Sequence, residues 1–299
     1  MIRIALATYA KLPNLGEDDR VLLPALAELG VAAVPAVWDA QDVHWEDFQG
    51  VLVRSCWDYH EKRDEFLRWL ARLERAGVAV WNPFELLRWN VHKGYLRDLE
   101  ARGVEVVETR WLARGDAVEL DALLHGAGWQ EAVVKPAVSA SAHRTWRTSA
   151  ATAGVDQARL DAQLRAGDAM VQPFLREVPD RGEWSIVFLG GRLSHAVLKR
   201  PAPGEYRVQW EFGGSAESRI PARRLIRDAE RVMAALATEP LYARVDGVER
   251  GSALVLMELE LVEPHLFLGW DAGAAQQLAA ALAGQLPPVS RAARSPARE

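Results

Sequence analysis

Three carboxylates in the last quarter of the chain have the types and spacing to bind a divalent cation. Asp246 is predicted to end the strand that begins at Tyr242, and Glu258 and Glu260 alternate with apolar residues. This period of two places both glutamates on one face of a strand. Carboxylate oxygens on a rigid sheet, completed by phosphate oxygens, suit Mg²⁺. The alternative interpretation is a solvated face of an exterior strand.

Two lysines could neutralise phosphate charge. Lys93 lies in the first turn of a helix predicted over 90–102, and Lys135 ends an apolar strand just before Pro136, which cannot continue a central ladder. An ammonium at the end of a buried strand must meet an anion or water. For either lysine alone, the alternative is a side chain that extends to the surface.

The segment after Lys135 could approach an anion with its backbone. Residues Ala137–Thr145 are mostly small, which lets N–H groups come close to a phosphate, but the segment contains no glycine. Met170–Leu175 is an extended run that could offer backbone groups to a flat base. With Arg244 and the three carboxylates, these features indicate a nucleoside triphosphate site. The Walker A pattern is absent from the sequence, which excludes a P-loop NTPase.

The N-terminal part has the pattern of a small parallel sheet. Strands alternate with helical periodicity, which predicts βαβ order, with ligands at the carboxyl ends of the strands. The predicted strands are Ile2–Ala7, Ala32–Val37, Gly50–Arg54 and Val78–Trp81, and the predicted helices are Asp19–Leu29, one beginning at Trp45, and Arg63–Ala76.

Residues Arg54–Tyr59 directly follow a strand of this sheet. Their polar types predict the lip of a substrate pocket in which Arg54 holds an anion. The alternative is a capped helix entry whose aromatic side chains only pack.

Strands dominate the second half of the chain. Gly190-Gly191 is typical of a hairpin turn, and the tail over 289–299 has no periodicity and is expected to be disordered. The predicted strands are Gly103–Val107, Glu131–Pro136, Met170–Leu175, Gly182–Leu189, Arg192–Lys199, Tyr206–Trp210, Tyr242–Gly247 and Ala253–Leu261, with helices near Leu120–Leu124, Pro221–Ala237 and Ala272–Leu282.

Composition narrows the class of protein. The 299 residues include 36 basic and 41 acidic side chains, a net charge of −5, so there is no basic field for a nucleic acid. No apolar run approaches the ~18 residues of a membrane span. The single cysteine, Cys56, cannot form an intramolecular disulfide, which favours a reducing, cytoplasmic compartment.

The order of these motifs resembles the ATP-grasp superfamily. The resemblance is closest to the branch of bacterial glutathione synthetases, ribosomal-protein glutamate ligases and the cycloserine-forming cyclo-ligase. It implies an α/β (α+β) fold with an N-terminal parallel-sheet domain over 1–89 and two α+β subdomains, 90–180 and 181–288, that clamp ATP. The motifs are Asn90-x-x-Lys93, Val134-Lys135-Pro136, Gln172-Pro-Phe-Leu175, Gly182-Glu-x-Ser185, Arg244-x-Asp246 and Glu258-x-Glu260.

The resemblance also implies roles for individual residues. ATP would contact the two lysines, serines of the small-residue segment, the hinge after the extended run and one glutamate: Lys93, Lys135, Ser139, Ser141, Gln172, Pro173, Phe174, Leu175 and Glu183. One or two Mg²⁺ ions would be held by Asp246, Glu258 and Glu260, the last at a position where many relatives carry Asn. Arg244, Lys199 and Arg207 would face the transferred phosphate and substrate. The substrate would meet Arg54, Ser55, Trp57, Asp58 and Tyr59.

The activity implied by the resemblance is an ATP-dependent carboxylate–amine ligase. Its small amino-acid-like or peptide substrate would pass through an acylphosphate. A cyclo-ligase that closes an amino-acid-derived ring is an alternative. Two further alternatives are a nucleotide-binding regulator without ligase activity and simple phosphotransfer onto a substrate oxygen. Relatives are often dimers, so the resemblance leaves a homodimer open.

Overall fold

The N-terminal part of the chain forms the predicted parallel sheet. The computed structural model describes residues 2–286, so the tail predicted over 289–299 lies outside the described residues. All four strands run parallel in the order β2-β1-β3-β4. Their bounds are β1 Ile2–Thr8, β2 Val31–Val37, β3 Gly50–Ser55 and β4 Ala79–Trp81.

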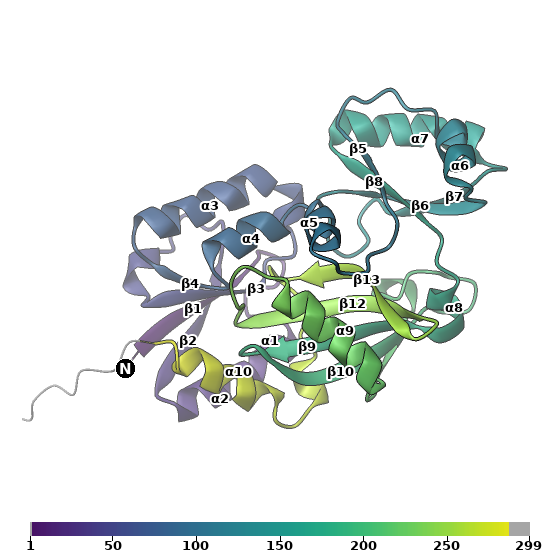
Figure 1. The fold of residues 1–299 in the computed structure, drawn as a ribbon. Coiled ribbons are helices and arrows are strands. Elements are labelled where there is room, and N and C mark those ends of the chain that lie inside the picture. Colours follow the sequence, from purple (N-terminus) through teal and green to yellow (C-terminus); the bar gives the residue numbers. More distant parts are fainter. Residues whose placement is uncertain (1, 287–299) are drawn as a thin grey trace, which may run out of the picture.

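Helices cover both faces of this sheet (Figure 1). Along β1, Ala5 and Ala7 face the core with α3 (Arg63–Arg75) and α4 (Phe84–Asn90), whereas Ile4 and Leu6 face α2 (Leu22–Glu28) and α10 (Ala274–Ala283). This alternation is expected of a strand buried on both sides. Because α10 comes from the end of the described chain, it joins the last part of the chain to the first sheet.

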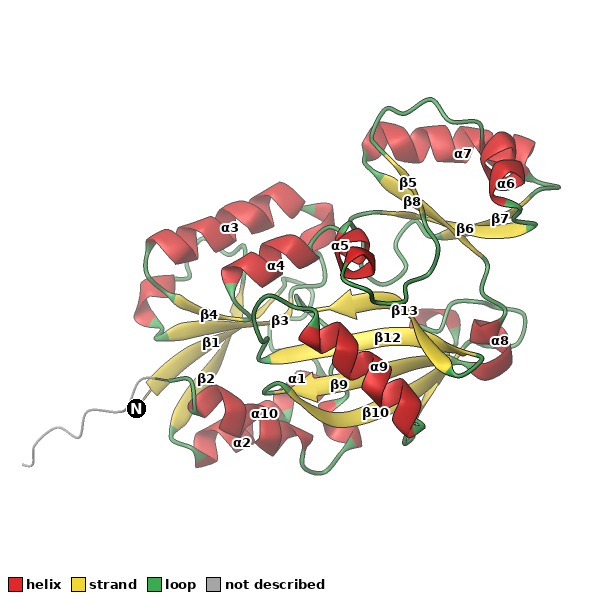
Figure 2. Cartoon of the chain, in the orientation of Figure 1, coloured by secondary structure: helices red, strands yellow, loops and turns green. Residues whose placement is uncertain are grey.

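A second sheet stands apart at the upper right of Figure 2, with α6 and α7 on one face. Its strands pair antiparallel in the order β5-β8-β6-β7, and β6 ends at Pro136 as expected. The bounds are β5 Arg110–Leu112, β6 Glu131–Pro136, β7 Trp146–Ser149, β8 Ala169–Pro173, α6 Leu120–Ala127 and α7 Ala153–Ala166.

The third sheet carries the three predicted metal ligands, together with Lys199 and Arg244. It is antiparallel, in the order β11-β10-β9-β12-β13, and α9 packs on one face through Leu225 and Ala229. Gly190 and Gly191 form the β9–β10 hairpin, both with positive φ, as predicted. The bounds are β9 Glu183–Leu189, β10 Arg192–Arg200, β11 Ser215–Ser218, β12 Tyr242–Arg250, β13 Ala253–Glu260, α8 Glu177–Arg181 and α9 Arg223–Ala234.

Several predicted elements differ in the structure. The helix predicted over 90–102 begins only at Tyr95, as α5 (Tyr95–Ala101). Asn90 is the last residue of α4, and the chain turns at Lys93, whose N–H donates to the Ala137 carbonyl oxygen at 2.7 Å. The predicted strand 103–107 makes only a bridge between Val106 and Leu256. The segment predicted as a strand over 206–210 is a loop that leads into a short 3₁₀ helix, and the helix at Trp45 is also only a 3₁₀ turn.

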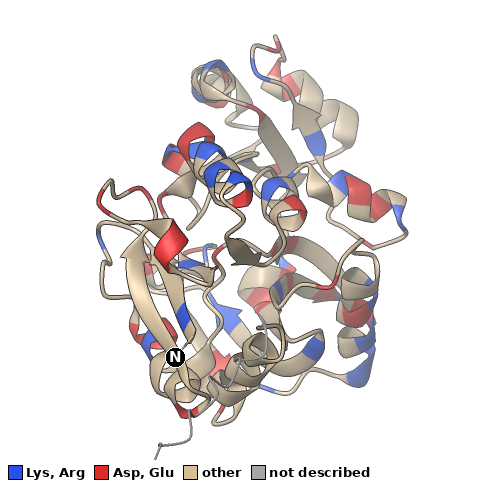
Figure 3. Cartoon of the chain, turned by 90° about the vertical axis from the view of Figure 1, so that its left-hand side faces the viewer, with Lys and Arg blue, Asp and Glu red and all other residues tan. Residues whose placement is uncertain are grey.

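Basic and acidic residues are interspersed along the helices (Figure 3). No helix within residues 2–286 is long and apolar enough to cross a membrane.

Candidate functional site

A cavity of about 260 Å³ lies where the second and third sheets meet the N-terminal part. Its wall includes strand ends of both sheets, the phosphate loop (residues 137–145) and the loop over 206–211. The cavity wall contains every residue predicted to contact nucleotide, metal or the transferred phosphate: Lys93, Lys135, Ser139, Ser141, Gln172, Pro173, Phe174, Leu175, Glu183, Lys199, Arg207, Arg244, Asp246, Glu258 and Glu260.

The three carboxylates converge from two neighbouring strands. Asp246 lies directly opposite Glu258 in the β12–β13 ladder, and Arg244 lies opposite Glu260. The prediction that Asp246 ends its strand is wrong, because β12 continues to Arg250 after a register shift at Asp246 and Gly247. Glu258 and Glu260 both face the cavity, as their period of two predicts.

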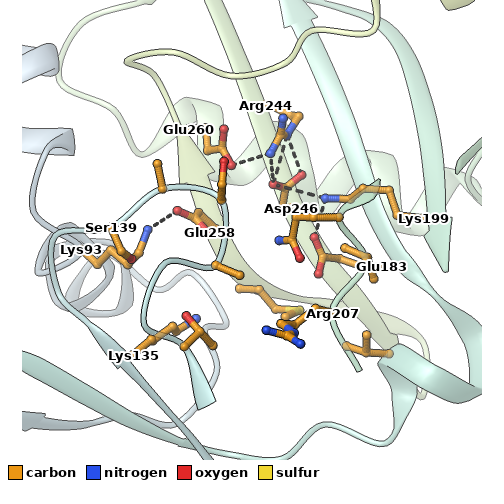
Figure 4. A pocket seen from close by; sticks show the side chains of 18 of the residues that line it. Lys93, Lys135, Ser139, Glu183, Lys199, Arg207, Arg244, Asp246, Glu258 and Glu260 are labelled. Atoms are coloured by element: carbon orange, nitrogen blue, oxygen red, sulfur yellow. Dashed lines mark hydrogen bonds and ion pairs between the residues drawn. The ribbon is translucent and has the colours of Figure 1, made fainter. Parts of the chain in front are cut away.

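Each carboxylate has a cationic partner (Figure 4). Lys93 pairs with Glu258, and Arg244 pairs with Glu260 while also donating to Asp246 through Nε and Nη2, the latter at 2.8 Å. Lys199 Nζ lies 3.7 Å from Asp246 Oδ2. Like charges on opposite residues of a ladder repel, so the cations stabilise an arrangement that would otherwise be unfavourable.

Burial and neighbouring charges shift the pKa values of Glu260 and Glu258 in opposite directions. Burial raises the pKa of Glu260 to about 7, an effect that Glu258 and Asp246 add to and that Arg244 opposes. Burial also acts on Glu258, but Lys93 and Lys135 outweigh it and hold the pKa of Glu258 below its usual value. A buried carboxyl that is still partly protonated near neutral pH is one whose ionised form a bound cation would stabilise.

Lys135 differs from the other two lysines. It faces the cavity from the end of β6 and forms no ion pair within 4.0 Å in the described part of the chain. Burial lowers its pKa to about 8. Lys199, in contrast, donates to Glu183 at 2.6 Å. The free ammonium of Lys135 is therefore available for an anionic ligand.

The phosphate loop reaches its conformation without glycine. Ser141, Ala142 and Arg144 have φ of 49°, 54° and 52°, in the left-handed region. This conformation costs about 1 kcal/mol for each such residue. Ser139 is anchored by donating its hydroxyl to the Pro136 carbonyl oxygen at 3.3 Å. The absence of glycine therefore does not prevent the turn that the loop requires.

One backbone N–H of the predicted hinge has no hydrogen-bond partner in the described part of the chain. The N–H of Phe174 donates to the Glu131 carbonyl oxygen, whereas the N–H of Leu175 makes no hydrogen bond within residues 2–286. Both residues line the cavity. A flat heterocyclic base could accept a hydrogen bond from such a backbone N–H.

Only two of the five residues predicted to contact the substrate line the cavity. Trp57 and Tyr59 line the cavity. Arg54 and Ser55 do not: they are buried on the other side of the strand end, where Asp19 accepts a hydrogen bond from Arg54 Nε at 2.8 Å and another from Ser55. Asp58 is also outside the cavity wall, since its carboxylate accepts from Trp38 and Lys62.

Arg207 lines the cavity from the loop over 206–211, but it is already paired. Its guanidinium contacts Glu205, with Nη2 2.7 Å from Oε2, and stacks over Phe212 with its central carbon 3.5 Å from the ring centre. The hydrogen bonds from Arg207 lower the pKa of Glu205 to about 2. Arg207 would have to leave Glu205 in order to contact a phosphate.

Two residues in this region were not predicted to have a role. Asn90 is buried and clamps β13, donating to the Leu259 carbonyl oxygen and accepting from Leu261 N–H, both at 2.8 Å. Glu263 lines the cavity, and burial raises its pKa well above the usual value, with Glu260 adding to the effect. Glu263 lies two residues after the predicted strand Ala253–Leu261, and this position is the one sequence feature that could have drawn attention to it.

Comparisons with known proteins agree with this architecture. A family profile described as the N-terminal domain of D-cycloserine synthetase DcsG matches residues 4–82. Cycloserine biosynthesis protein DcsG from Streptomyces lavendulae is 32% identical over 307 residues, covering 95% of this chain and 99% of that protein. The crystal structure of D-cycloserine synthetase DcsG has a TM-score of 0.87 and 28% identity, covering 95% of this chain and 100% of that one.

A more distant structure shares the fold. D-Alanine–D-alanine ligase from Bacillus anthracis has a TM-score of 0.69 at 15% identity, covering 96% of this chain and 97% of that one. The fold, and the order of the site residues along the chain, define an ATP-grasp ligase, an ATP-dependent enzyme that forms carbon–nitrogen bonds. Within this superfamily the chain belongs to the family of cycloserine biosynthesis protein DcsG. The predicted fold class is confirmed.

Proposed function

We propose that the cavity binds ATP with a small amino-acid-derived carboxylate and activates that carboxylate as an acylphosphate. The observation that carries this proposal is the convergence of three cations and three carboxylates on one wall, with the unpaired Lys135 facing them. Phosphoryl transfer depends on positioning and charge stabilisation, and this wall supplies both.

Residues of the second and third sheets and of the turn before α5 hold the nucleotide in this proposal. The hinge over Gln172–Leu175 receives the base edge at the free N–H of Leu175. The ammonium groups of Lys93 and Lys135 neutralise phosphate oxygens, while Ser139 and Ser141 present the phosphate loop to them. Glu183, held by Lys199 at 2.6 Å, lies at the ribose side of the cavity.

The carboxylates Asp246, Glu258 and Glu260 fit one or two Mg²⁺ ions. All three are hard oxygen donors on adjacent strands, and burial, with the neighbouring Glu258 and Asp246 adding to it, raises the pKa of Glu260 to about 7. Magnesium at this position would neutralise charge on the phosphate oxygens during transfer. Glu260 and Asp246 keep Arg244 oriented toward the cavity, where its guanidinium stabilises the transferred phosphoryl group.

The chemistry balances without a nucleophile from the protein. A substrate carboxylate oxygen bonds to the γ-phosphorus, the bond to the bridging oxygen breaks, and ADP leaves. An amine nitrogen then bonds to the carbonyl carbon of the acylphosphate, phosphate leaves with the former carboxylate oxygen, and the nitrogen loses a proton. Trp57 and Tyr59 form the apolar side of the substrate region.

Ring closure is the second candidate function. The match to cycloserine biosynthesis protein DcsG covers 99% of that protein, so the whole site region is shared. In this case the amine and the activated carboxylate belong to one molecule, and the product is a cyclic amide such as cycloserine.

The test is a screen for ADP release with Mg²⁺-ATP over amino acids, dipeptides and amino acids with a side-chain amine or oxyamine. The expected result is substrate-dependent ADP with an equal amount of orthophosphate and a linear or cyclic amide. A stable phosphoester in place of orthophosphate would show simple phosphotransfer. Nucleotide binding without turnover on any substrate would favour a regulator.

A further inference from the structure

A group of potential metal ligands lies outside the nucleotide cavity. His60 and Glu61 belong to a 3₁₀ turn (Tyr59–Glu61) that follows β3, and His143 belongs to the phosphate loop. One ligand atom from each of the three residues lies within 4.8 Å of the others, and the His60 and His143 rings have centroids 4.9 Å apart. His143 lies more than eighty positions after His60 and Glu61, so the fold brings the three residues together.

His60 has no protein partner that explains its position. Both ring nitrogens of His60 are shielded from solvent, and neither has a hydrogen-bond partner within residues 2–286. Shielded polar atoms without partners are costly and call for a ligand or an ordered water. His143 does not line the nucleotide cavity, although its neighbours Ala142 and Thr145 do.

The donor set selects a class of metal. Two imidazoles and one carboxylate are typical of zinc and similar divalent transition metals, whereas Mg²⁺ prefers oxygen ligands alone. In a tetrahedral site with bonds of about 2.0–2.2 Å, ligand atoms lie about 3.4 Å apart. The ligand atoms lie within 4.8 Å of one another, so they would have to approach by up to about 1.4 Å, and the exposed His143 side chain on its loop can supply that movement.

We propose that His60, Glu61 and His143 form a binding site for a divalent transition metal of the zinc class, which fastens the phosphate loop to the N-terminal part. Three protein ligands leave one position of a tetrahedral ion for water. The bound ion would hold the loop that contains Ser139 and Ser141 in one place. Its existence does not depend on the ligase activity.

The binding experiment uses the full chain without a histidine tag and without nucleotide. Zn²⁺ is titrated by calorimetry in millimolar Mg²⁺, which occupies oxygen-only sites. The parent is expected to bind one equivalent of Zn²⁺. His143→Ala and His60→Gln should each bind Zn²⁺ at least tenfold more weakly. His125→Ala, which removes an exposed histidine of α6, is the matched control and should bind as the parent does. Absence of Zn²⁺ binding, or equal binding by the parent and His143→Ala, would overturn the site.

Limited proteolysis tests the fastening separately. Arg144 is exposed in the phosphate loop, so trypsin can cut after it. Zn²⁺ should slow this cut several-fold in the parent and leave it unchanged in His143→Ala, which also controls for any effect of zinc on trypsin. Zinc binding with no protection of the Arg144–Thr145 bond would show that the ion does not hold the loop. Because neither readout uses turnover, failure here is distinguishable from failure of the proposed function.

Discussion

Asp246 of β12 and Glu258 of β13 are direct partners in one antiparallel ladder, yet each is paired with a different lysine. Lys199 of β10 lies 3.7 Å from Asp246, and Lys93, from the turn before α5, contacts Glu258. Two carboxylates are thus held side by side by cations from different parts of the chain. Such an arrangement is unfavourable for the fold alone and favourable for a ligand that brings further positive charge.

Glu258→Gln should abolish most of the turnover. The amide keeps the shape and can still accept from Lys93, but it removes one of the charges that face the metal position. Loss of one electrostatic contribution of this kind costs about 10²–10³ in rate. ADP release over a range of Mg²⁺ concentrations measures the effect. Glu249→Gln, on β12 outside the cavity wall, is the matched control and should keep the parent's rate. Parental turnover of Glu258→Gln at limiting Mg²⁺ would place the metal elsewhere.

ATP affinity should fall with rising pH because of Lys135. Burial lowers the pKa of Lys135 to about 8, so its ammonium is charged below that pH and neutral above it. Glu260, with a pKa of about 7, is already ionised over this range. The ATP dissociation constant should therefore rise up to about tenfold between pH 8 and pH 9.5. Lys135→Arg keeps its charge throughout and should flatten the profile. A parent whose affinity is independent of pH, or a Lys135→Arg profile as steep as the parent's, would contradict this assignment.

Arg54 should contribute to the free energy of unfolding. Its guanidinium is buried and bound to Asp19 and to the Pro264 carbonyl oxygen, which joins the first sheet to the segment after β13. Arg54→Met leaves the Asp19 carboxylate buried without its cation, which costs about 3–5 kcal/mol in the free energy of unfolding. Urea unfolding measures this loss, and adding Asp19→Leu to Arg54→Met should recover part of it. Unchanged stability of Arg54→Met, with weaker substrate binding, would instead support the predicted anion clamp.

Much of the fold could be predicted because it depends on local patterns. The βαβ order, the Gly190-Gly191 hairpin and the alternation of Glu258 and Glu260 each follow from periodicity or turn chemistry within a few residues. The predicted strands 103–107 and 206–210 failed because their apolar residues pack in loops: Val208 is buried in a cluster with Leu175 and Val178 without joining a sheet.

The site could be predicted only in part. The sequence order indicated the cations and carboxylates, but it could not show that Arg54 is neutralised by Asp19, thirty-five positions earlier. Nor could it show that Arg207 is held by Glu205, or that His143 meets His60. These relationships depend on tertiary packing, which brings together residues that have no common periodicity.

The most direct test of the account is the fate of the carboxylate oxygen. A substrate found in the ADP-release screen is prepared with ¹⁸O in its carboxylate, and the released phosphate is examined by mass spectrometry. Attack of the carboxylate on the γ-phosphorus predicts one ¹⁸O atom in each phosphate released, with one amide formed for each ADP. Phosphate that contains no ¹⁸O would contradict an acylphosphate and with it the proposed chemistry of this cavity.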